Sequence, residues 1–383
     1  MSIDNLFFEL LQVAIGNRDT LSVVPTKEQW TELFVLSKKQ ALVAVAFRGI
    51  SKQKDCVQDG MSPICKNLPE ILYLKWLGMT AKIAQRNKES KDLCRNLSEM
   101  YRMDGFDCCV MKGQSNRLYY PDELAVCRSS GDIDMWMRPM NKVKHPVAET
   151  MHYFQKKDDI VSLCYLHIEN KHVDSVPLEV HFRPSFFNEP IINRRFLRWM
   201  KWNDCVEWSD ILGFNVLKTD YNLVFQMNHL YRHLLDEGIG LRQVLDYYFL
   251  LKKFTQGDKT RMHKKDLMTV VKRLGMERFA GALMWVLMVV LAMPKEELLC
   301  ETNEKDGRFL LDEIMRSGNF GHYDPRMQKL QGDSHSLHIQ LHRVWLRMRR
   351  NIRFVISYPS EVVFEPIARA EHFLWRKLKL WRF

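Results

Sequence analysis

The sequence has none of the segments that mark an exported or membrane-spanning protein. Its amino terminus, MSIDNLFFELLQVAIGN, carries Asp4 and Glu9 and lacks the basic stretch that precedes the apolar part of a secretion signal. The longest apolar run, residues 279–293, is shorter than the roughly 20 residues that a spanning helix needs, and Pro294 follows it. We therefore expect a cytoplasmic protein without a transmembrane segment, in which this run forms a buried helix.

Patterned cysteines, internal repeats and low-complexity linkers are also missing. The nine cysteines include no CxxC pair and no regular ladder, which excludes the usual patterns of zinc ribbons and disulfide-rich secreted domains. We interpret them as reduced thiols. A content of 46% hydrophobic and 27% charged residues is ordinary for a folded globular protein. A chain of 383 residues is long for one core, so two or three packed units are expected.

The formal charge of +11 is concentrated near the carboxyl end. Residues 339–383 carry ten Lys or Arg against three Glu, together with Trp345, Trp375 and Trp381. This tail is suited to nucleic-acid phosphates, an anionic membrane surface or an acidic partner. The same composition fits a final pair of helices that dock on the body and leave their arginines in solvent.

Three regions follow one another along the chain. Apolar residues recur about every 3.6 positions in residues 1–103, which predicts helices, and Thr26 with Gln29 has the pattern of a capping box. Short β-rich runs and one helix predict an α/β unit in residues 104–188. Helical spacing returns in residues 189–383, which include the basic tail. The sequence therefore predicts an α+β fold, with a small mixed sheet embedded between two larger helical regions.

Several segments are defined well enough to be compared with a structure. One helix is predicted over residues 28–50, and a polar loop with Gly60, Pro63 and Pro69 follows it. A further helix is predicted from about residue 142 to residue 156. The four β-rich runs are FDCCVMKG, DIDMWMRP, LCYLHIEN and VPLEVHFRP.

Two aspartates one residue apart, in SSGDIDMWM, form the first candidate for a catalytic site. On a strand, Asp132 and Asp134 project from one face with Cα atoms roughly 6.5 Å apart, while Ile133 points into a core. Glu179 and His181 share one face of a second strand. Three carboxylates on adjoining strands can bind two divalent ions for phosphoryl transfer, and Mg²⁺ prefers such oxygen ligands. Alternatively, the aspartates are the polar start of a strand, Glu179 pairs with an arginine, and His181 is structural or orients a carboxylate.

The segment VMKGQSNRLYY is a candidate for holding phosphate. An apolar strand ends before Lys112 and Gly113, and Gln114 and Ser115 open a short helix. Free N–H groups at a helix amino terminus bind anions, and glycine lets the backbone approach closely. The segment is not a Walker A motif, which would read GxxxxGK[ST]. An ordinary strand-to-helix turn with a solvated lysine has the same appearance.

Two arginines have open roles. Arg128 is a candidate phosphate contact, or it pairs with Asp122 or Glu123. Arg242 and Asp246 are four residues apart on a predicted helix and are expected to form a salt bridge at its surface or with another helix. A contact between Arg242 and the substrate is the alternative.

Two histidines on the same predicted helix raise the question of zinc. His229 and His233 are four residues apart and share a face, as the ligands of a metal site would. No third ligand accompanies them at a clear spacing. The sequence therefore does not favour a zinc site here.

The motifs, taken in order, carry a resemblance to a known family. The series MKGQSNRLYYPDE, Arg128 with SSGDIDMWM, and LEVHFRP resembles the uncharacterised nucleotidyltransferase family of the DNA polymerase beta-like superfamily. HLYRHLLDEGIGLRQVLDYYFLL and MRSGNFGHYDPR resemble the helical half of that family. The resemblance covers roughly residues 105–325. It implies a minimal polymerase beta-like palm with helices packed around it.

The resemblance also implies roles for individual residues. Asp132 and Asp134 would ligate both metal ions, Mg²⁺ or Mn²⁺, and Glu179 would ligate the catalytic ion and act as, or position, the base. The segment from Gly113 to Ser115 would hold nucleotide phosphates, although the superfamily's usual small pair after an apolar residue is here Gly-Gln-Ser. The nucleotide-binding residues implied in full are Lys112, Gly113, Gln114, Ser115, Arg128, Ser130 and Gly131, with His181 and Arg242 as further substrate contacts.

The function implied is transfer of a nucleoside monophosphate from a nucleoside triphosphate such as ATP to an acceptor on a small molecule or a protein, with release of pyrophosphate. A template-directed polymerase is not favoured, because no thumb or duplex-binding module is evident. The main alternative is a catalytically inactive nucleotide-binding or scaffold protein that acts through its helical surfaces. In a third interpretation, less favoured, the basic tail binds nucleic acid and the palm modifies its end.

Overall fold

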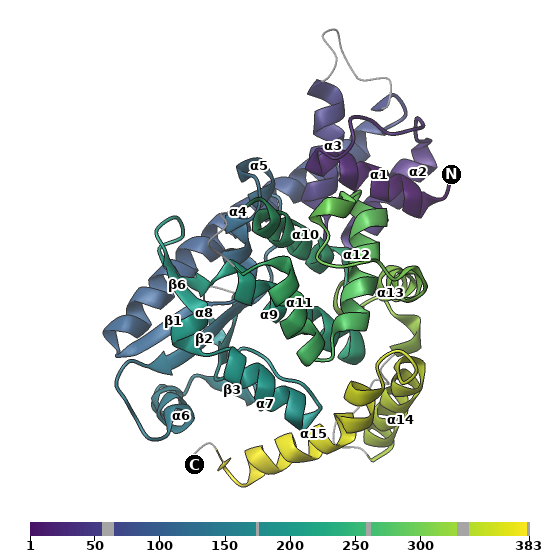
Figure 1. Cartoon of the computed structure of the whole chain (residues 1–383). Coiled ribbons are helices and arrows are strands. Elements are labelled where there is room, and N and C mark those ends of the chain that lie inside the picture. Colours follow the sequence, from purple (N-terminus) through teal and green to yellow (C-terminus); the bar gives the residue numbers. More distant parts are fainter. Residues whose placement is uncertain (56–64, 174–175, 258–261, 328–336, 381–383) are drawn as a thin grey trace.

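The computed structural model describes residues 1–55, 65–173, 176–257, 262–327 and 337–380, and it confirms the α+β fold (Figure 1). A seven-stranded mixed sheet lies in the middle, with helices from both ends of the sequence around it. The strand order is β3-β4-β5-β2-β1-β7-β6. The strands are β1 (Phe106–Val110), β2 (Ile133–Pro139), β3 (Ile160–Leu163), β4 (His167–Val173), β5 (Val176–His181), β6 (Val206–Ser209) and β7 (Phe214–Leu217).

The first four helices are α1 (Ile3–Ile15), α2 (Lys27–Lys39), α3 (Val43–Asp55) and α4 (Glu70–Met103). The capping box is confirmed, because the Thr26 hydroxyl accepts from the Gln29 N–H and the Gln29 side chain accepts from the Thr26 N–H. The single helix predicted over residues 28–50 is wrong. Ala41 has a left-handed backbone (φ 54°), which no α-helix can continue through, so α2 ends and α3 begins beyond it. The loop predicted after it, over residues 51–70, begins too early, because residues 51–55 belong to α3; residues 56–64, with Gly60 and Pro63, lie outside the described residues.

One face of the sheet is covered by the second half of α4 and by α6 (Pro146–Lys156), the helix predicted near residues 142–156. Ile133 is buried in this layer, as expected, and so are Leu178 and Val180, which alternate with Glu179 and His181 along β5. The helical residues that pack on them include Leu93, Leu97, Tyr101, Met151 and Phe154. The polar residues between these apolar ones must therefore face the other side of the sheet.

The strand predictions needed two corrections. LCYLHIEN is not one strand, because β3 ends at Leu163 and the chain turns back, with the Cys164 N–H donating to the His167 carbonyl at 3.0 Å. β6 and β7 lie in a region predicted to be helical. Each has four residues, too few for a period to show, and their tight turn contains Gly213 at φ +77°. β7 pairs with β1 in parallel and so belongs to the same sheet.

The remaining helices of the body are α7 (Pro190–Trp199), α8 (Trp202–Cys205), α9 (Thr219–Asp236), α10 (Leu241–Gln256), α11 (Lys264–Arg273), α12 (Glu277–Leu291) and α13 (Glu304–Ser317). Shorter helical turns are η2 (Gly113–Leu118), α5 (Asp122–Ala125), η3 (Lys295–Glu297), η4 (Asn319–Gly321) and η5 (Pro325–Met327). The long apolar run forms α12, which is buried, as expected. In the described part of the chain, no helix combines the length and the apolar character needed to cross a membrane.

The basic tail forms α14 (Leu337–Phe354) and α15 (Pro359–Lys377), which lie at the end of the molecule away from α1–α3 (Figure 1). Both helices dock on the body. Arg350 is buried and donates to the carbonyl of Leu235 at 2.7 Å, and Phe354 is fully buried. The Glu361 carboxylate accepts from the N–H of Asn188 at 2.7 Å.

Candidate active site

The three candidate carboxylates lie together on the sheet face opposite α4 and α6. Asp134 and Glu179 are directly paired on the parallel strands β2 and β5, and Asp132 comes just before β2. One oxygen of each carboxylate lies within 4.8 Å of the others. The Asp134 side chain is only 1% exposed, whereas those of Glu179 and Asp132 are 22% and 30% exposed. The cluster is therefore anchored in the sheet and accessible from one side.

Lys112 and His181 bring hydrogen-bond donors against these carboxylates. Lys112 Nζ lies 3.1 Å from Asp134 Oδ1 and 3.9 Å from Asp132 Oδ2. His181 Nε2 lies 3.0 Å from Asp134 Oδ1 and 3.3 Å from Glu179 Oε2. Burial alone would raise the pKa of Glu179, but the hydrogen bond to His181 and nearby positive charge lower it to about 2. At Asp134, too, burial raises the pKa of the carboxyl, but Lys112 and His181 lower it by more, so that the net shift is downward. Both groups are held as carboxylates.

This donor set fits a divalent metal ion. Asp134 Oδ2 is buried and has no hydrogen-bond partner, although an ionised oxygen in that position is costly unless it is satisfied. The carboxylates of Asp132, Asp134 and Glu179 outnumber the cations against them, which are Lys112 and, when it is protonated, His181, whose pKa is raised, despite burial, by its hydrogen bonds to Asp134 and Glu179. Carboxylate oxygens are the ligands that Mg²⁺ and other hard cations prefer.

The turn after β1 passes directly beside the carboxylates. The Met111 N–H donates to the Asp134 carbonyl at 3.1 Å, and Gly113 has φ +65°, a conformation that favours glycine. Gln114 is buried and donates to Asn87 at 3.2 Å and to the Ser130 hydroxyl at 3.1 Å. Gln114 therefore ties η2 to α4 and to the segment before Asp132.

The phosphate-binding candidates divide into two sets by position. Side chains or backbone of Lys112, Gly113, Arg128, Gly131 and Arg242 line a cavity next to Asp132. Gln114, Ser115 and Ser130 do not line it, and the first two are almost fully buried. The structure thus brings the first set together at this cavity, whereas the second set lies outside its lining.

Arg128 forms a buried ion pair that bridges to α10. Its Nε and Nη2 donate to the two oxygens of Asp246 at 2.7 Å each, and the Tyr120 hydroxyl donates to Asp246 Oδ1, also at 2.7 Å. Arg128 and Asp246 are 5% and 4% exposed. The suggested partners Asp122 and Glu123 are therefore wrong.

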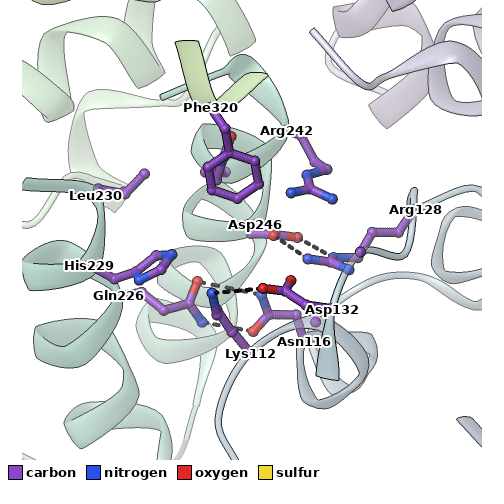
Figure 2. Close-up of a pocket in the computed structure, with 13 residues that line it drawn as sticks. Lys112, Asn116, Arg128, Asp132, Gln226, His229, Leu230, Arg242, Asp246 and Phe320 are labelled. Atoms are coloured by element: carbon purple, nitrogen blue, oxygen red, sulfur yellow. Dashed lines mark hydrogen bonds and ion pairs between the residues drawn. The ribbon is translucent and has the colours of Figure 1, made fainter. Parts of the chain in front are cut away.

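Arg242 does not form the predicted salt bridge with Asp246. It donates through Nη1 to the Ser129 carbonyl at 3.1 Å, and its guanidinium lies 5.4 Å from the centre of the Phe320 ring. Arg242 is buried on the wall of the cavity rather than on a helix surface. In Figure 2, Arg242 and Lys112 point into the same space as Asp132, with Phe320 above them and the Arg128–Asp246 pair at its edge.

A second cavity of about 350 Å³ adjoins the first and contains the metal-binding candidates. Both are lined by Lys112, Asp132, His229 and Phe320, so they share a boundary. The volume falls in the range of small-molecule sites, which is about 300–1,000 Å³. The first cavity has a volume of only about 30 Å³, so the larger one is the space beside Asp132 that has room for a substrate.

Sequence reasoning missed several side chains of the larger cavity, which are His167, Glu169, Arg232, Glu237, Phe320 and His322. Phe320 and His322 lie within MRSGNFGHYDPR, so the family resemblance was the signal available for them. His229 and His233 also line the cavity, with ring centres 4.2 Å apart. Neither belongs to the groups of possible metal ligands found among the described residues.

Comparison with known proteins supplies the family. The family model described as "uncharacterised nucleotidyltransferase" matches residues 26–292, which is more than half of the chain and includes every candidate residue. No curated protein sequence matches the chain. A solved structure, an antigenic nucleotidyltransferase-like protein from Paracoccidioides brasiliensis, is similar over 53% of this chain and 91% of that chain, with 13% identity and a TM-score of 0.30. On the strength of the family match, the chain belongs to the uncharacterised nucleotidyltransferases.

Proposed function

We propose that the chain is a divalent-metal-dependent nucleotidyltransferase that moves a nucleoside monophosphate from a nucleoside triphosphate to a hydroxyl or similar acceptor on a small molecule or protein. The observation that carries this proposal is the convergence of Asp132, Asp134 and Glu179 around an unpartnered buried oxygen at the junction of two cavities. The family supports a transferase.

In this reaction the acceptor oxygen forms a bond to the α-phosphorus, its proton passes to Glu179 or to a water molecule that Glu179 positions, and the bond from the α-phosphorus to the bridging oxygen breaks with release of pyrophosphate. Asp132, Asp134 and Glu179 would hold the metal, Mg²⁺ or Mn²⁺. A bound divalent ion supplies Lewis-acid stabilisation of the charged oxygens. Lys112 and Arg242, which reach the cavity from opposite sides of Asp132, would bind triphosphate oxygens.

Arg128 has a positioning role in this proposal. Its guanidinium is occupied by Asp246 and by the neighbouring Ser129 carbonyl, at 3.4 Å from Nη1. Together with Gln114, which holds Ser130, it fixes the segment that delivers Gly131 and Asp132 to the cavity. This segment lies between α4 and α10, so its placement depends on both helical regions.

Calorimetric titration tests the proposal. Purified protein is titrated with non-hydrolysable ATP and CTP analogues, with and without Mg²⁺, and compared with Asp132→Asn. The matched control is Asp107→Asn, because the Asp107 side chain is 27% exposed but lies outside both cavities. We expect metal-dependent binding that weakens at least tenfold in Asp132→Asn and is unchanged in the control.

Transfer itself is followed with triphosphates labelled at the α-phosphate, incubated with candidate acceptors. Label should become acid-stable on the acceptor only when the metal and Asp132 are both present. A folded wild-type protein that binds no triphosphate under any of these conditions would contradict the proposal and favour the inactive scaffold.

A further inference from the structure

A second group of possible metal ligands lies on the side of Glu179 away from Asp132. His167 from β4 and His181 from β5 both approach the Glu179 carboxylate, and the three ligand atoms lie within 4.8 Å of one another. His167 Nδ1 and His181 Nε2 are each 3.3 Å from the same atom, Glu179 Oε2. In a tetrahedral site with metal–ligand bonds of about 2.0–2.1 Å, neighbouring ligand atoms are about 3.3 Å apart.

Hydrogen bonding alone leaves this group unsatisfied. His167 Nδ1 is buried and, at 3.3 Å from Glu179, makes no hydrogen bond of acceptable geometry. The single Nε2 position of His181 faces two carboxylates, Asp134 Oδ1 at 3.0 Å and Glu179 Oε2 at 3.3 Å. One cation among these atoms would satisfy the nitrogen lone pairs and the carboxylates together.

We propose that His167, Glu179 and His181 form a site for a borderline divalent transition metal of the Zn²⁺, Fe²⁺ and Ni²⁺ class, next to the all-oxygen site of Asp132 and Asp134. Imidazole ligands favour such ions over Mg²⁺, whereas carboxylates alone do not. The three residues line the cavity of about 350 Å³, so an open coordination position would face substrate or water. Because Glu179 belongs to both sets, the inference rests partly on the proposed function, but metal binding is measurable without nucleotide.

Co²⁺ can take the place of such ions in a protein site, and its visible absorption depends on the number and geometry of its ligands. Chelator-treated wild-type protein is titrated with CoCl₂ in the absence of nucleotide, alongside His167→Asn. Asp132→Asn tests the neighbouring site, and His152→Asn removes an exposed histidine on α6 as a matched control. Circular dichroism verifies that each variant is folded.

We expect strong visible bands in wild type, with affinity lowered at least tenfold in His167→Asn and unchanged in Asp132→Asn and His152→Asn. Retained Mg²⁺-dependent nucleotide binding in His167→Asn would show that only the second site was lost. Absence of Co²⁺ binding, or weak octahedral bands that depend on Asp132 and not on His167, would overturn the inference while leaving the proposed function standing.

The tail carries a second, independent feature, an apolar stripe on the exposed side of α14. Its members are Leu341, Val344, Trp345, Met348 and Ile352, and their exposed fractions lie between 49% and 68%. At 3.6 residues per turn these positions form one face, and the docked residues Ile339, Leu346, Arg350 and Phe354 form the opposite one. The helix is therefore apolar on a face that the described body does not cover.

The charge around this stripe is of one sign. α14 contains five arginines and no acidic residue. Arg347 and Arg349 are exposed and lie on the two sides of the stripe, and the Arg349 guanidinium is 4.6 Å from the centre of the Trp345 ring. An apolar face containing tryptophan and bordered by arginine is the pattern of a helix that lies in the interface of an anionic membrane.

We infer that the α14 stripe binds anionic lipid surfaces. Sedimentation with vesicles of phosphatidylserine and phosphatidylcholine, compared with phosphatidylcholine alone, tests this. The variant is Trp345→Glu/Met348→Glu. The matched control is Ile71→Glu/Leu74→Glu, which puts the same charges at exposed apolar positions of α4.

Binding should require phosphatidylserine, fall at least tenfold in the α14 variant and persist in the control. No vesicle binding would overturn the inference. So would a dimer, seen by light scattering, that the α14 variant dissociates, because the stripe would then be a contact between two copies of the chain.

Discussion

Loss of the Asp246 charge should destabilise the protein far more than loss of an exposed carboxylate. In Asp246→Asn the side chain keeps its size and one acceptor oxygen, but Arg128 loses its direct counter-charge, and an amide N–H group replaces one of its two acceptors. Arg128 is 5% exposed, so water cannot readily replace the carboxylate. Removing one partner of a buried ion pair costs about 3–5 kcal/mol. Because the retained oxygen still accepts one bond, we expect about 3 kcal/mol.

Urea unfolding of wild type and variants measures this cost. Glu304→Gln is the reference, because it removes one carboxylate from the exposed Arg308–Glu304 pair and should cost less than about 1 kcal/mol. Arg128→Met/Asp246→Asn should be more stable than Asp246→Asn alone, since the uncompensated charge is removed. Metal-dependent nucleotide binding should also weaken in Asp246→Asn, because Arg128 holds the segment before Asp132.

The reasoning is refuted if Asp246→Asn loses less than about 1 kcal/mol, or if the costs of the Arg128 and Asp246 changes simply add. Either result would mean that solvent in the adjoining cavity compensates Arg128. The pair would then be an ordinary polar contact and not the anchor of the site.

Three further predictions concern the surroundings of the site and the tail. Gly321→Ala should destabilise strongly and lower the melting temperature, because its Cβ would lie 1.9 Å from the Glu237 carbonyl oxygen at φ +67°; an unchanged melting temperature would contradict this. Phe320→Ala should weaken nucleotide binding by roughly tenfold, about 1.4 kcal/mol, because the Phe320 ring lines the cavity and is placed to pack on the bound base. Calorimetry measures the affinity, and an unchanged value would place the base elsewhere. Burial raises the pKa of Glu361 from 4.5 to about 7, so its carboxyl is protonated in the folded state and ionised in the unfolded state between these values. The stability of wild type relative to Glu361→Gln should therefore fall by up to about 3 kcal/mol as the pH rises through this window, which urea unfolding at pH 4.5 and pH 8 measures.

The local sequence pattern was sufficient to predict those features that depend only on residues close together in the chain. Thr26 and Gln29 define a helix start because both capping bonds lie within one turn. Ile133, Leu178 and Val180 predict a buried face because alternation along a strand is fixed by backbone geometry. Where the local signal was short it failed, as at the four-residue strands β6 and β7 and at the left-handed Ala41.

The sequence by itself determined the α+β fold class, the buried faces of two strands and the carboxylates that lie on or directly beside these strands, because these follow from periodicity and order along the chain. Tertiary structure alone decided which side chains from distant parts of the chain meet at the site. Arg128 and Asp246 are 118 residues apart, and His167 reaches Glu179 only because β4 pairs with β5. Such contacts depend on strand order and helix packing, which the whole core determines. The sequence around the contacting residues shows no periodic pattern that would predict them.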